Sequence, residues 1–277
     1  MLQPPVAGVR LWSIPRPLID QVVRVKFLIA VTAAVLAVAL TSTSAPAEGL
    51  NLSWDDCGTH GVQQRTFACD TNAGSNTIVG SFVAGAYLTA VTGAEAVMDL
   101  NSSSPALPNW WMQRTGSCRA GSLNGNFDFT AGPFNCFDYW QGGAIGAITQ
   151  DPPDGNRVRI KGVFALPTDD SRIGPIAEGT EVYAFKAVIT NARTTGLGAC
   201  SGCDAGACIV FHHILLYQPP PDHSNYYLSA PADRQFVTWQ CPGDIQIVDP
   251  GIGQFCHLDC PTPAGSRTWG QIKQLYR

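Results

Sequence analysis

The stretch GACSGCDAGACIVFHH, residues 198–213, gathers residue types that hold metal ions or exchange electrons. It contains three cysteines and an adjacent histidine pair, namely Cys200, Cys203, Cys208, His212 and His213. The Cys-x2-Cys spacing is that of a zinc knuckle or of a redox pair, and the third cysteine with the histidines would complete four zinc ligands. In an oxidising compartment the same cysteines would form disulfide bonds instead. The compartment therefore decides between the three interpretations.

The N-terminal segment predicts export. Arg24 and Lys26 precede an apolar run without charge from Phe27 to Leu40, and the small-x-small site Ala45-Pro46-Ala47 follows it. These are the three parts of a secretory signal peptide. We expect residues 1–47 to comprise an upstream extension plus this signal peptide. The rest of the chain is then secreted or held in the cell envelope, in the periplasm or outside the cell.

The alternative is an uncleaved signal segment that anchors the chain, which would be its one contact with a membrane. The apolar run is shorter than the roughly 20 residues that a membrane-spanning helix needs, and this favours cleavage. The first twenty residues are proline-rich and precede the basic segment of the signal peptide. Initiation at Val25 instead of Met1 is therefore a further hypothesis.

All ten cysteines lie beyond the predicted signal peptide, and an even number in an exported chain indicates a disulfide framework. The ten are Cys57, Cys69, Cys118, Cys136, Cys200, Cys203, Cys208, Cys241, Cys256 and Cys260. Proximity in the sequence suggests that Cys57 pairs with Cys69 and that Cys118 pairs with Cys136, each closing a short loop between neighbouring strands. At least one further bridge is expected to join the triplet within 200–208 to the triplet within 241–260.

The segment that follows Cys208 weakens the zinc and redox interpretations. IVFHHILLY has the composition of a strand, so alternation would point His212 and His213 to opposite faces and keep them from sharing one metal ion. A redox Cys-x-x-Cys pair is expected at a turn from a strand into a helix, and no helical pattern follows here. Disulfide bonds are therefore the favoured interpretation of the stretch.

Composition limits the partners and the fold class. The chain has 17 basic and 21 acidic residues, and no basic cluster lies beyond the signal region. Nucleic-acid binding needs a concentrated basic surface, so we expect no nucleic-acid partner. Glycine and proline are abundant, at 28 and 20 residues, and only 14% of the residues are charged. This is typical of a loop-rich all-β protein.

Short extended segments separated by turn residues recur along the chain, at 50–54, 64–69, 77–84, 94–100, 110–113, 126–129, 157–166, 181–190, 208–217 and 236–241. RVRIKGVFAL, at 157–166, alternates most regularly, with arginines and lysine on one face and aliphatic side chains on the other. EVYAFKAVIT, at 181–190, is apolar on both faces apart from Lys186 and is expected to be buried on both. Ten such segments predict a two-sheet β-sandwich, cohesin-like or jelly-roll, over residues 48–240.

Residues 241–277 lack this periodicity and are predicted to form an irregular tail tethered by disulfide bonds. On a helix Trp269, Ile272 and Tyr276 would share one face. Such a short helix is marginal alone in water, so it needs a partner. That partner is either the sandwich itself or export or surface machinery that reads the tail as a docking signal.

No catalytic signature is present. The chain has no G-x-S-x-G motif, no H-E-x-x-H motif and no glycine-rich phosphate loop. Neighbouring carboxylates occur at Asp55-Asp56, at Asp128 and Asp138, and at Asp169-Asp170. A glycoside hydrolase uses two carboxylates close in space, so a secreted carbohydrate-active hydrolase is the alternative function. Solvated loops explain these pairs more simply.

Calcium is the one ion that the sequence suggests as a cofactor. The segments DTNAGSN, at 70–76, and DPPDGN, at 151–156, place hard oxygen ligands in turns. The candidate ligands are Asp70, Asn72, Asp151 and Asp154. Neither segment matches an EF-hand loop, and hydrogen bonding within Asx turns explains both equally well. The expectation is therefore no cofactor or, at these two loops, calcium.

Aromatic residues in the expected loops and strand ends are candidates for stacking on sugar rings. The candidates are Trp110, Trp111, Tyr139, Trp140, Tyr226 and Tyr227. Because tryptophan and tyrosine are mostly buried on average, packing in the core is the favoured alternative. A glycan or another surface or envelope partner is the ligand class that these residues suggest.

Taken together, GLNLSWDDCG, FACDTNAGSN, ALPNWW, GACSGC and TWGQIKQLYR resemble an uncharacterised group of secreted bacterial proteins. The resemblance spans most of the mature chain and implies no catalytic residues. EVYAFKAVIT and CIVFHHILLY are similar to late strands of cohesin-like sandwiches, which implies a fold and no function. The sequence thus predicts an exported, disulfide-stabilised binding or structural module, with no enzymatic activity as the favoured expectation.

Overall fold

Two β-sheets pack face to face in the computed structural model, which describes residues 48–133, 135–167, 169–219, 224–229, 234–241, 245–248 and 255–258. The expectations for residues 1–47, Cys260 and the tail residues Trp269, Ile272 and Tyr276 fall outside these ranges. Within them, no helix is both long enough and apolar enough to cross a membrane. The protein is an all-β sandwich, as the sequence predicted.

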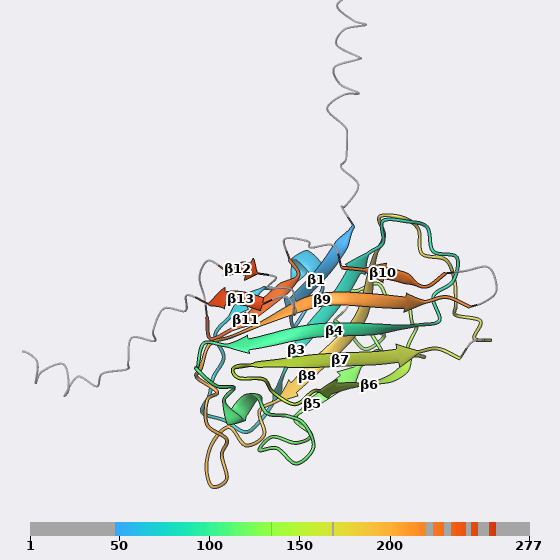
Figure 1. Cartoon of the computed structure of the whole chain (residues 1–277). Helices are drawn as coiled ribbons and strands as arrows, with labels where there is room; N and C mark the ends of the chain where they lie inside the picture. The colour runs from blue at the N-terminus through green and yellow to red at the C-terminus, as the bar shows by residue number, and fades with distance from the viewer. Residues whose placement is uncertain are drawn as a thin grey trace, which may run out of the picture. The chain divides into compact units, whose positions relative to one another are not determined.

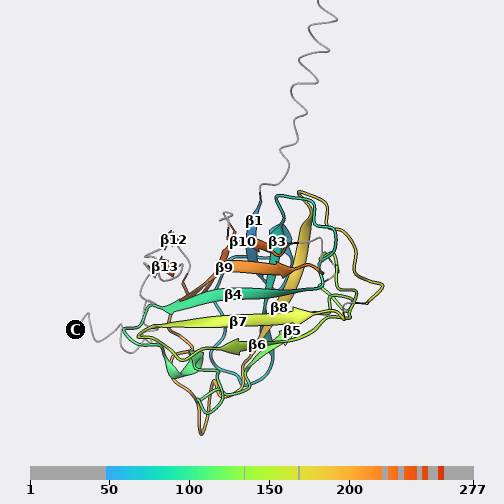
Figure 2. The same ribbon diagram turned by 45° about the vertical axis from the view of Figure 1, so that its right-hand side comes forward.

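The smaller sheet has four strands in the order β1-β3-β8-β5. These are β1 (Gly49–Trp54), β3 (Ser75–Val83), β8 (Glu181–Thr190) and β5 (Leu123–Asn126). The larger sheet has the order β2-β11-β9-β4-β7-β6, with β10 also paired to β9. Its strands are β2 (Gln64–Arg65), β11 (Phe236–Trp239), β9 (Ala207–Tyr217), β4 (Gly93–Ser102), β7 (Arg157–Ala165), β6 (Ile145–Gln150) and β10 (Tyr226–Leu228). The strands of the two sheets cross at a large angle (Figure 1 and Figure 2).

A separate hairpin, β12 (Ile245–Val248) with β13 (Phe255–Leu258), lies beside one end of β9 and β11 (Figure 1). Two short 3-10 helices, η1 (Gly58–His60) and η2 (Asn109–Trp111), lie in connections. The strand expected at 110–113 is therefore wrong, because η2 turns both of its tryptophans into the core. Strands β6, β10, β12 and β13 were not predicted.

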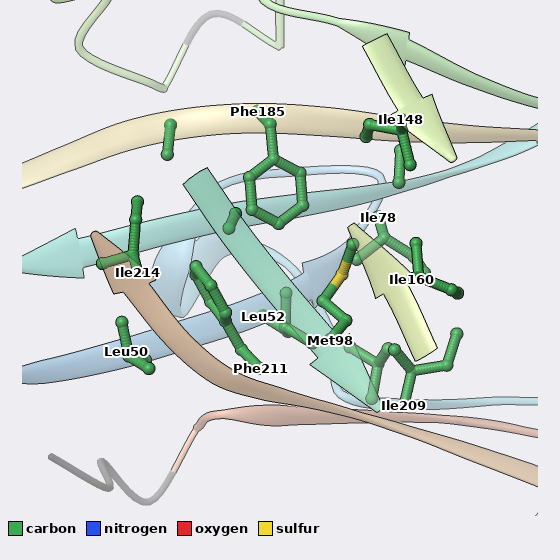
Figure 3. Close-up of a cluster of buried hydrophobic side chains, with 14 of the residues drawn as sticks. Leu50, Leu52, Ile78, Met98, Ile148, Ile160, Phe185, Ile209, Phe211 and Ile214 are labelled. Carbon is green, nitrogen blue, oxygen red and sulfur yellow. The ribbon is translucent and has the colours of Figure 1, made fainter. Parts of the chain in front are cut away.

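The core lies between the sheets and is built by alternation along each strand. Figure 3 shows Leu52 of β1, Met98 of β4, Phe185 of β8 and Phe211 of β9 converging there. On β7 the side chains at even positions from Val158 onward are buried, whereas the basic ones face outward, as the sequence predicted. One end of the core is filled by an aromatic cluster of Trp54, Phe67, Trp110, Trp111 and Trp239.

The outer side of the smaller sheet is covered over β8, so this strand is buried on both faces as expected. The loop around Phe129 packs against Tyr183, and the disulfide bond between Cys57 and Cys136 belongs to the same cluster. Beneath this loop the Lys186 ammonium donates hydrogen bonds to the carbonyl oxygens of Asp128 and of Gly132, the latter at 2.9 Å. Burial lowers the pKa of Lys186.

Disulfide bonds join segments far apart in the sequence. The described pairs are Cys57–Cys136, Cys69–Cys203, Cys118–Cys200 and Cys208–Cys256, with Cα atoms 5.4–6.0 Å apart. Cys241 is also disulfide-bonded. The predicted short loops are therefore wrong, because connections that follow one another in the chain lie at different places on the sandwich. The predicted bridge between 200–208 and 241–260 is confirmed by Cys208–Cys256.

One buried cation was not foreseen. Arg119 has no exposed surface, and its guanidinium lies 3.7 Å from the centre of the Trp110 ring. It donates hydrogen bonds to the carbonyl oxygens of Trp110 and Ala192, both at 3.0 Å, and of Thr190. Burial lowers its pKa to about 10. Arg119 thus ties η2 to the end of β8.

Replacing Arg119 with methionine should lower the free energy of unfolding by about 3 kcal/mol, because the buried Trp110 carbonyl and the partly buried Thr190 and Ala192 carbonyls lose their donor. The matched control is Arg193→Met, since Arg193 donates one hydrogen bond, to the carbonyl of Cys118, at an exposed position. That change should cost less than about 1 kcal/mol. The free energy of unfolding of both variants is measured in urea with the disulfide bonds intact. If the two substitutions lower it equally, Arg119 does not stabilise the connection between η2 and β8.

Candidate functional site

The outer side of the larger sheet is covered at one end by the β12–β13 hairpin. The disulfide bond Cys208–Cys256 fixes β13 to β9, and the Asn101 side-chain amide exchanges two hydrogen bonds with the Cys256 backbone, at 2.9 and 3.2 Å. Beyond that hairpin the outer sides of β10, β9, β7 and β6 carry half-buried and exposed side chains. Between them, the outer residues of β4 are half-buried at Glu95 and buried at Val97 and Asp99. We call this surface the open face.

Strand register arranges the open face in three rows across the sheet. The first row is Tyr227, Leu215, Glu95, Val163 and Ala147. The second row is His213, Val97, Lys161 and Thr149. The third row begins at Val210, which packs against Cys256 of the hairpin, and continues on the open face with Asp99 and Arg159. Asp151 lies next to Arg159 through a backbone hydrogen bond. The first row is thus mainly aromatic and aliphatic, whereas the second and third rows carry most of the charge.

A register shift in the pairing of β9 with β4 places both histidines on the open face. Val97 is opposite His213 and Met98 is opposite Phe211, which leaves His212 as the extra residue of a β-bulge. Phe211 remains in the core, and the two imidazole Nδ1 atoms lie 3.3 Å apart. The expectation that the two histidines point to opposite faces is therefore wrong, because regular alternation stops at the bulge.

The histidine pair has an aromatic neighbour on one side. The Tyr227 ring lies with its centre 5.1 Å from that of His213, tilted by 34°. Burial lowers the pKa of the His213 imidazole, and the neighbouring His212 ring and Arg159 guanidinium lower it further. His213 therefore favours the neutral form more than an ordinary histidine does.

A buried carboxylate lies on the other side of the pair. Asp99 is 1% exposed and accepts two hydrogen bonds from Arg159, Nε to Oδ1 at 2.8 Å and Nη2 to Oδ2 at 3.1 Å. The same Oδ2 atom lies 3.5 Å from Nδ1 of His212. The hydrogen bond to Asp99 raises the pKa of Arg159, so this guanidinium stays charged.

A surface pocket of about 310 Å³ adjoins this ion pair. It is lined by Asp99, Asp151, Pro152, Asp154, Arg157, Val158 and Arg159. The structure thus brings the two predicted calcium ligands, Asp151 and Asp154, to the edge of the open face. Asp151, however, pairs with the Lys161 ammonium at 2.9 Å, and two arginines share the pocket. The pocket therefore presents mixed charge and lacks the all-oxygen ligand set that calcium requires.

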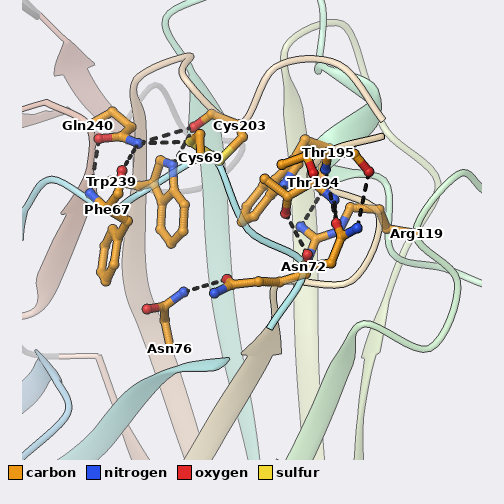
Figure 4. Close-up of a disulfide and its surroundings, with 12 residues drawn as sticks. Phe67, Cys69, Asn72, Asn76, Arg119, Thr194, Thr195, Cys203, Trp239 and Gln240 are labelled. Carbon is orange, nitrogen blue, oxygen red and sulfur yellow. Dashed lines mark hydrogen bonds between the residues drawn. A yellow bond between two sulfur atoms is a disulfide. The ribbon is translucent and has the colours of Figure 1, made fainter. Parts of the chain in front are cut away.

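The other predicted calcium loop is joined to a second loop by hydrogen bonds of Asn72. The side-chain oxygen of Asn72 accepts the backbone N–H groups of Thr194 and Thr195 at 2.8 and 2.9 Å, and its amide donates to the Thr195 carbonyl (Figure 4). Asp70 is exposed beside it. Asn72 thus holds two loops together, which supports hydrogen bonding within the loops over metal binding.

The predicted cysteine ligands are used in disulfide bonds. Cys200, Cys203 and Cys208 each have a cysteine partner, so the zinc-knuckle and redox interpretations are wrong. Figure 4 shows Cys69 and Cys203 joined beside the Trp239 ring. Asp56, Cys57 and Cys136 also place ligand-type atoms within 4.8 Å of one another, but both sulfur atoms there belong to one disulfide bond.

Most of the candidate stacking residues are in the core. Trp110, Trp111 and Trp140 have no exposed surface, and Tyr139 is 5% exposed. The prediction that these four contact a ligand is wrong, because the loops that carry them fold over the ends of the sandwich. Tyr226 is packed partly against the core, whereas Tyr227 is 56% exposed. Tyr227 is thus the candidate with a free ring face.

The predicted carboxylate pairs are engaged with other groups. Asp55 pairs with Arg65, and the Asp56 carboxylate accepts hydrogen bonds from its neighbour's backbone and from Asn135. Hydrogen bonds from Thr130 lower the pKa of Asp128, and those from Arg172 lower the pKa of Asp170 to about 2. A general acid needs a raised pKa, which is the opposite shift.

The main residues of the open face were missed as a site. Glu95 and Asp99 are isolated acids inside the apolar strand β4, and such a buried acid was a signal that the sequence offered. The second signal was the pair His212-His213 itself, because two polar residues in succession inside an apolar strand would place one of them in the core if alternation were regular. Comparison with known proteins adds no further guide, since no family model, curated protein or solved structure matches the chain.

Replacing Asp99 with asparagine should lower the free energy of unfolding by about 3 kcal/mol, because it leaves Arg159 without its buried counter-charge. The matched control is Asp151→Asn, which breaks the exposed pair with Lys161 and should cost no more than about 1 kcal/mol. Urea unfolding at neutral pH measures both. If the two substitutions cost the same, the buried ion pair does not hold the open face in place.

Proposed function

We propose that the protein is an exported binding module whose open face binds an extended polar ligand of the glycan class. The observation that supports this most directly is the exposed Tyr227 ring, which lies beside His213 and next to the two rows that carry most of the charge. A tyrosine ring offers an apolar surface for a sugar ring, and charged side chains offer hydrogen bonds to hydroxyl groups. The two kinds of contact lie on one continuous surface.

The dimensions of the open face suit a chain-like ligand. Strands lie about 4.8 Å apart and rise about 3.3 Å per residue, so the three rows over β9, β4 and β7 span roughly 10 Å by 13 Å. The pocket lined by Asp151, Asp154 and Arg157 extends this surface at its charged end. A ligand of several sugar units can therefore contact Tyr227 and the charged rows together.

The carboxylates favour binding over hydrolysis. Asp99 is paired with Arg159, and Asp151 with Lys161, so two of the three acids that line the pocket have a cation as partner. A glycoside hydrolase needs one carboxylic acid with a raised pKa facing a second carboxylate. The lowered pKa of Asp128 and of Asp170 supports the same preference elsewhere on the surface.

Location outside the cytoplasm is part of the proposal. Four described disulfide bonds and a disulfide-bonded Cys241 are compatible with an extracellular or envelope location, because such bonds persist in oxidising compartments. The sequence pattern of a signal peptide before residue 48 supports export by a separate argument. The ligand would then be a glycan of a cell surface or of the surrounding medium.

A panel of immobilised neutral and acidic oligosaccharides, probed with the purified, disulfide-intact protein, tests the proposal. For each glycan bound, Tyr227→Ala should weaken the affinity about fivefold, which corresponds to the loss of roughly 1 kcal/mol of stacking. Tyr87→Ala is the matched control, because Tyr87 is 61% exposed and lies in the β3–β4 connection. Binding to no member of the panel, or cleavage of a bound glycan, would refute the proposal.

A further inference from the structure

We propose that His212 and His213 form a binding site for a divalent transition-metal ion of the zinc and copper class. The inference goes beyond the proposed glycan binding and depends on a different observation. Two adjacent histidines on a regular strand cannot share an ion, because their side chains alternate between faces. The β-bulge in β9 removes that obstacle, and bulges recur where a strand re-aims a side chain for function.

The distance between the two rings fits a shared ion. The two Nδ1 atoms lie 3.3 Å apart. Two imidazole nitrogens bound to one zinc ion at about 2.0–2.1 Å, with a tetrahedral angle between them, are separated by about 3.3–3.4 Å. The pair therefore needs little movement to bind an ion from the solvent side.

Backbone pairing holds the two histidines in this arrangement. Along one edge, β9 is paired with β4 both before and after the bulge. Along its other edge, β9 is paired with β10 from Ile214 onward. Phe211 and Ile214, on either side of the histidines, are fully buried in the core. The bulge is thus fixed by its neighbours, and an ion would meet ligands that are already ordered.

Asp99 supplies the nearest carboxylate. Its Oδ2 atom is 3.5 Å from Nδ1 of His212, while its Oδ1 atom is held by Nε of Arg159 at 2.8 Å. Because that Nδ1 atom is the one that would bind the ion, Arg159 orients the carboxylate beside the position of the ion itself. The negative charge of Asp99 also offsets the nearby guanidinium. Water or a bound ligand would complete the coordination.

The cysteines that surround this segment in the sequence take no part. Cys200, Cys203 and Cys208 are in disulfide bonds, so the site has nitrogen and oxygen ligands only. Imidazole and carboxylate together suit Zn²⁺ and Cu²⁺, and the order of stability among first-row ions predicts tighter binding of Cu²⁺. A metal-free pair joined by one imidazole–imidazole hydrogen bond is the competing explanation of the same 3.3 Å distance.

Isothermal titration calorimetry with Zn²⁺ and with Cu²⁺, on protein purified without a histidine tag, tests the proposal. We expect one equivalent to bind and to be removed by a chelator. His212→Gln and His213→Gln should each weaken binding at least tenfold, because loss of even an outer partner of a metal ligand typically lowers metal affinity by that factor. His60→Gln is the matched control, because His60 is an exposed histidine of η1 and should have no effect.

Electron paramagnetic resonance of the Cu²⁺-loaded, unmodified protein keeps the test independent of variant folding. Coupling to two imidazole nitrogens is the expected spectrum. Absence of saturable binding, an affinity of the two variants equal to that of the unmodified protein, or a spectrum without imidazole coupling would each overturn the proposal and leave the hydrogen-bonded pair as the explanation. Because no sugar is added, failure here would not bear on glycan binding.

Discussion

The pairing of β9 with β4 is regular except at one place, and that irregularity determines what the outer side of the larger sheet presents. Side chains on a strand alternate with a period of two, so one extra residue reverses the facing of everything that follows. In β9 the residues that face the core are Ile209 and Phe211 before the bulge and Ile214 and Leu216 after it, and all four are buried. A strand without the bulge would expose one of these two pairs to water. The bulge resolves the conflict by turning His212 and His213 to the outside together.

The sequence predicted those parts of the fold in which local pattern and tertiary structure agree. The alternation of β7 is regular, and it correctly placed Arg159 and Lys161 on an outer face. It could not say what would lie opposite them, because the neighbour of a strand is decided by topology. Asp99 of β4 is the partner of Arg159 only because of the register between β4 and β7, which joins two residues 60 positions apart in the chain.

The predictions for the cysteine pairs and for the tryptophans were wrong for a related reason. Nearness in sequence predicted short disulfide loops, yet Cys69 and Cys203 are 134 residues apart and meet beside Trp239. In a sandwich the connections that meet at one place often come from distant parts of the chain, so spacing carries little information on pairing. Trp110 and Trp111 were assigned to a strand, where only one ring faces inward. The helical turn η2 buries both.

The composition of the outer side itself explains why the hairpin covers one end and leaves the other open. Where β13 lies, the sheet presents Cys208, Val210 and the partly buried Phe236, an apolar patch that gains from cover. Beyond it the sheet presents paired charges, histidines and a tyrosine, which water solvates well. Covering that part would require burial of the Asp99–Arg159 pair together with its neighbours, at a cost in desolvation that packing repays poorly. The open face is therefore stable as an open surface, and the disulfide bond Cys208–Cys256 sets where that surface begins.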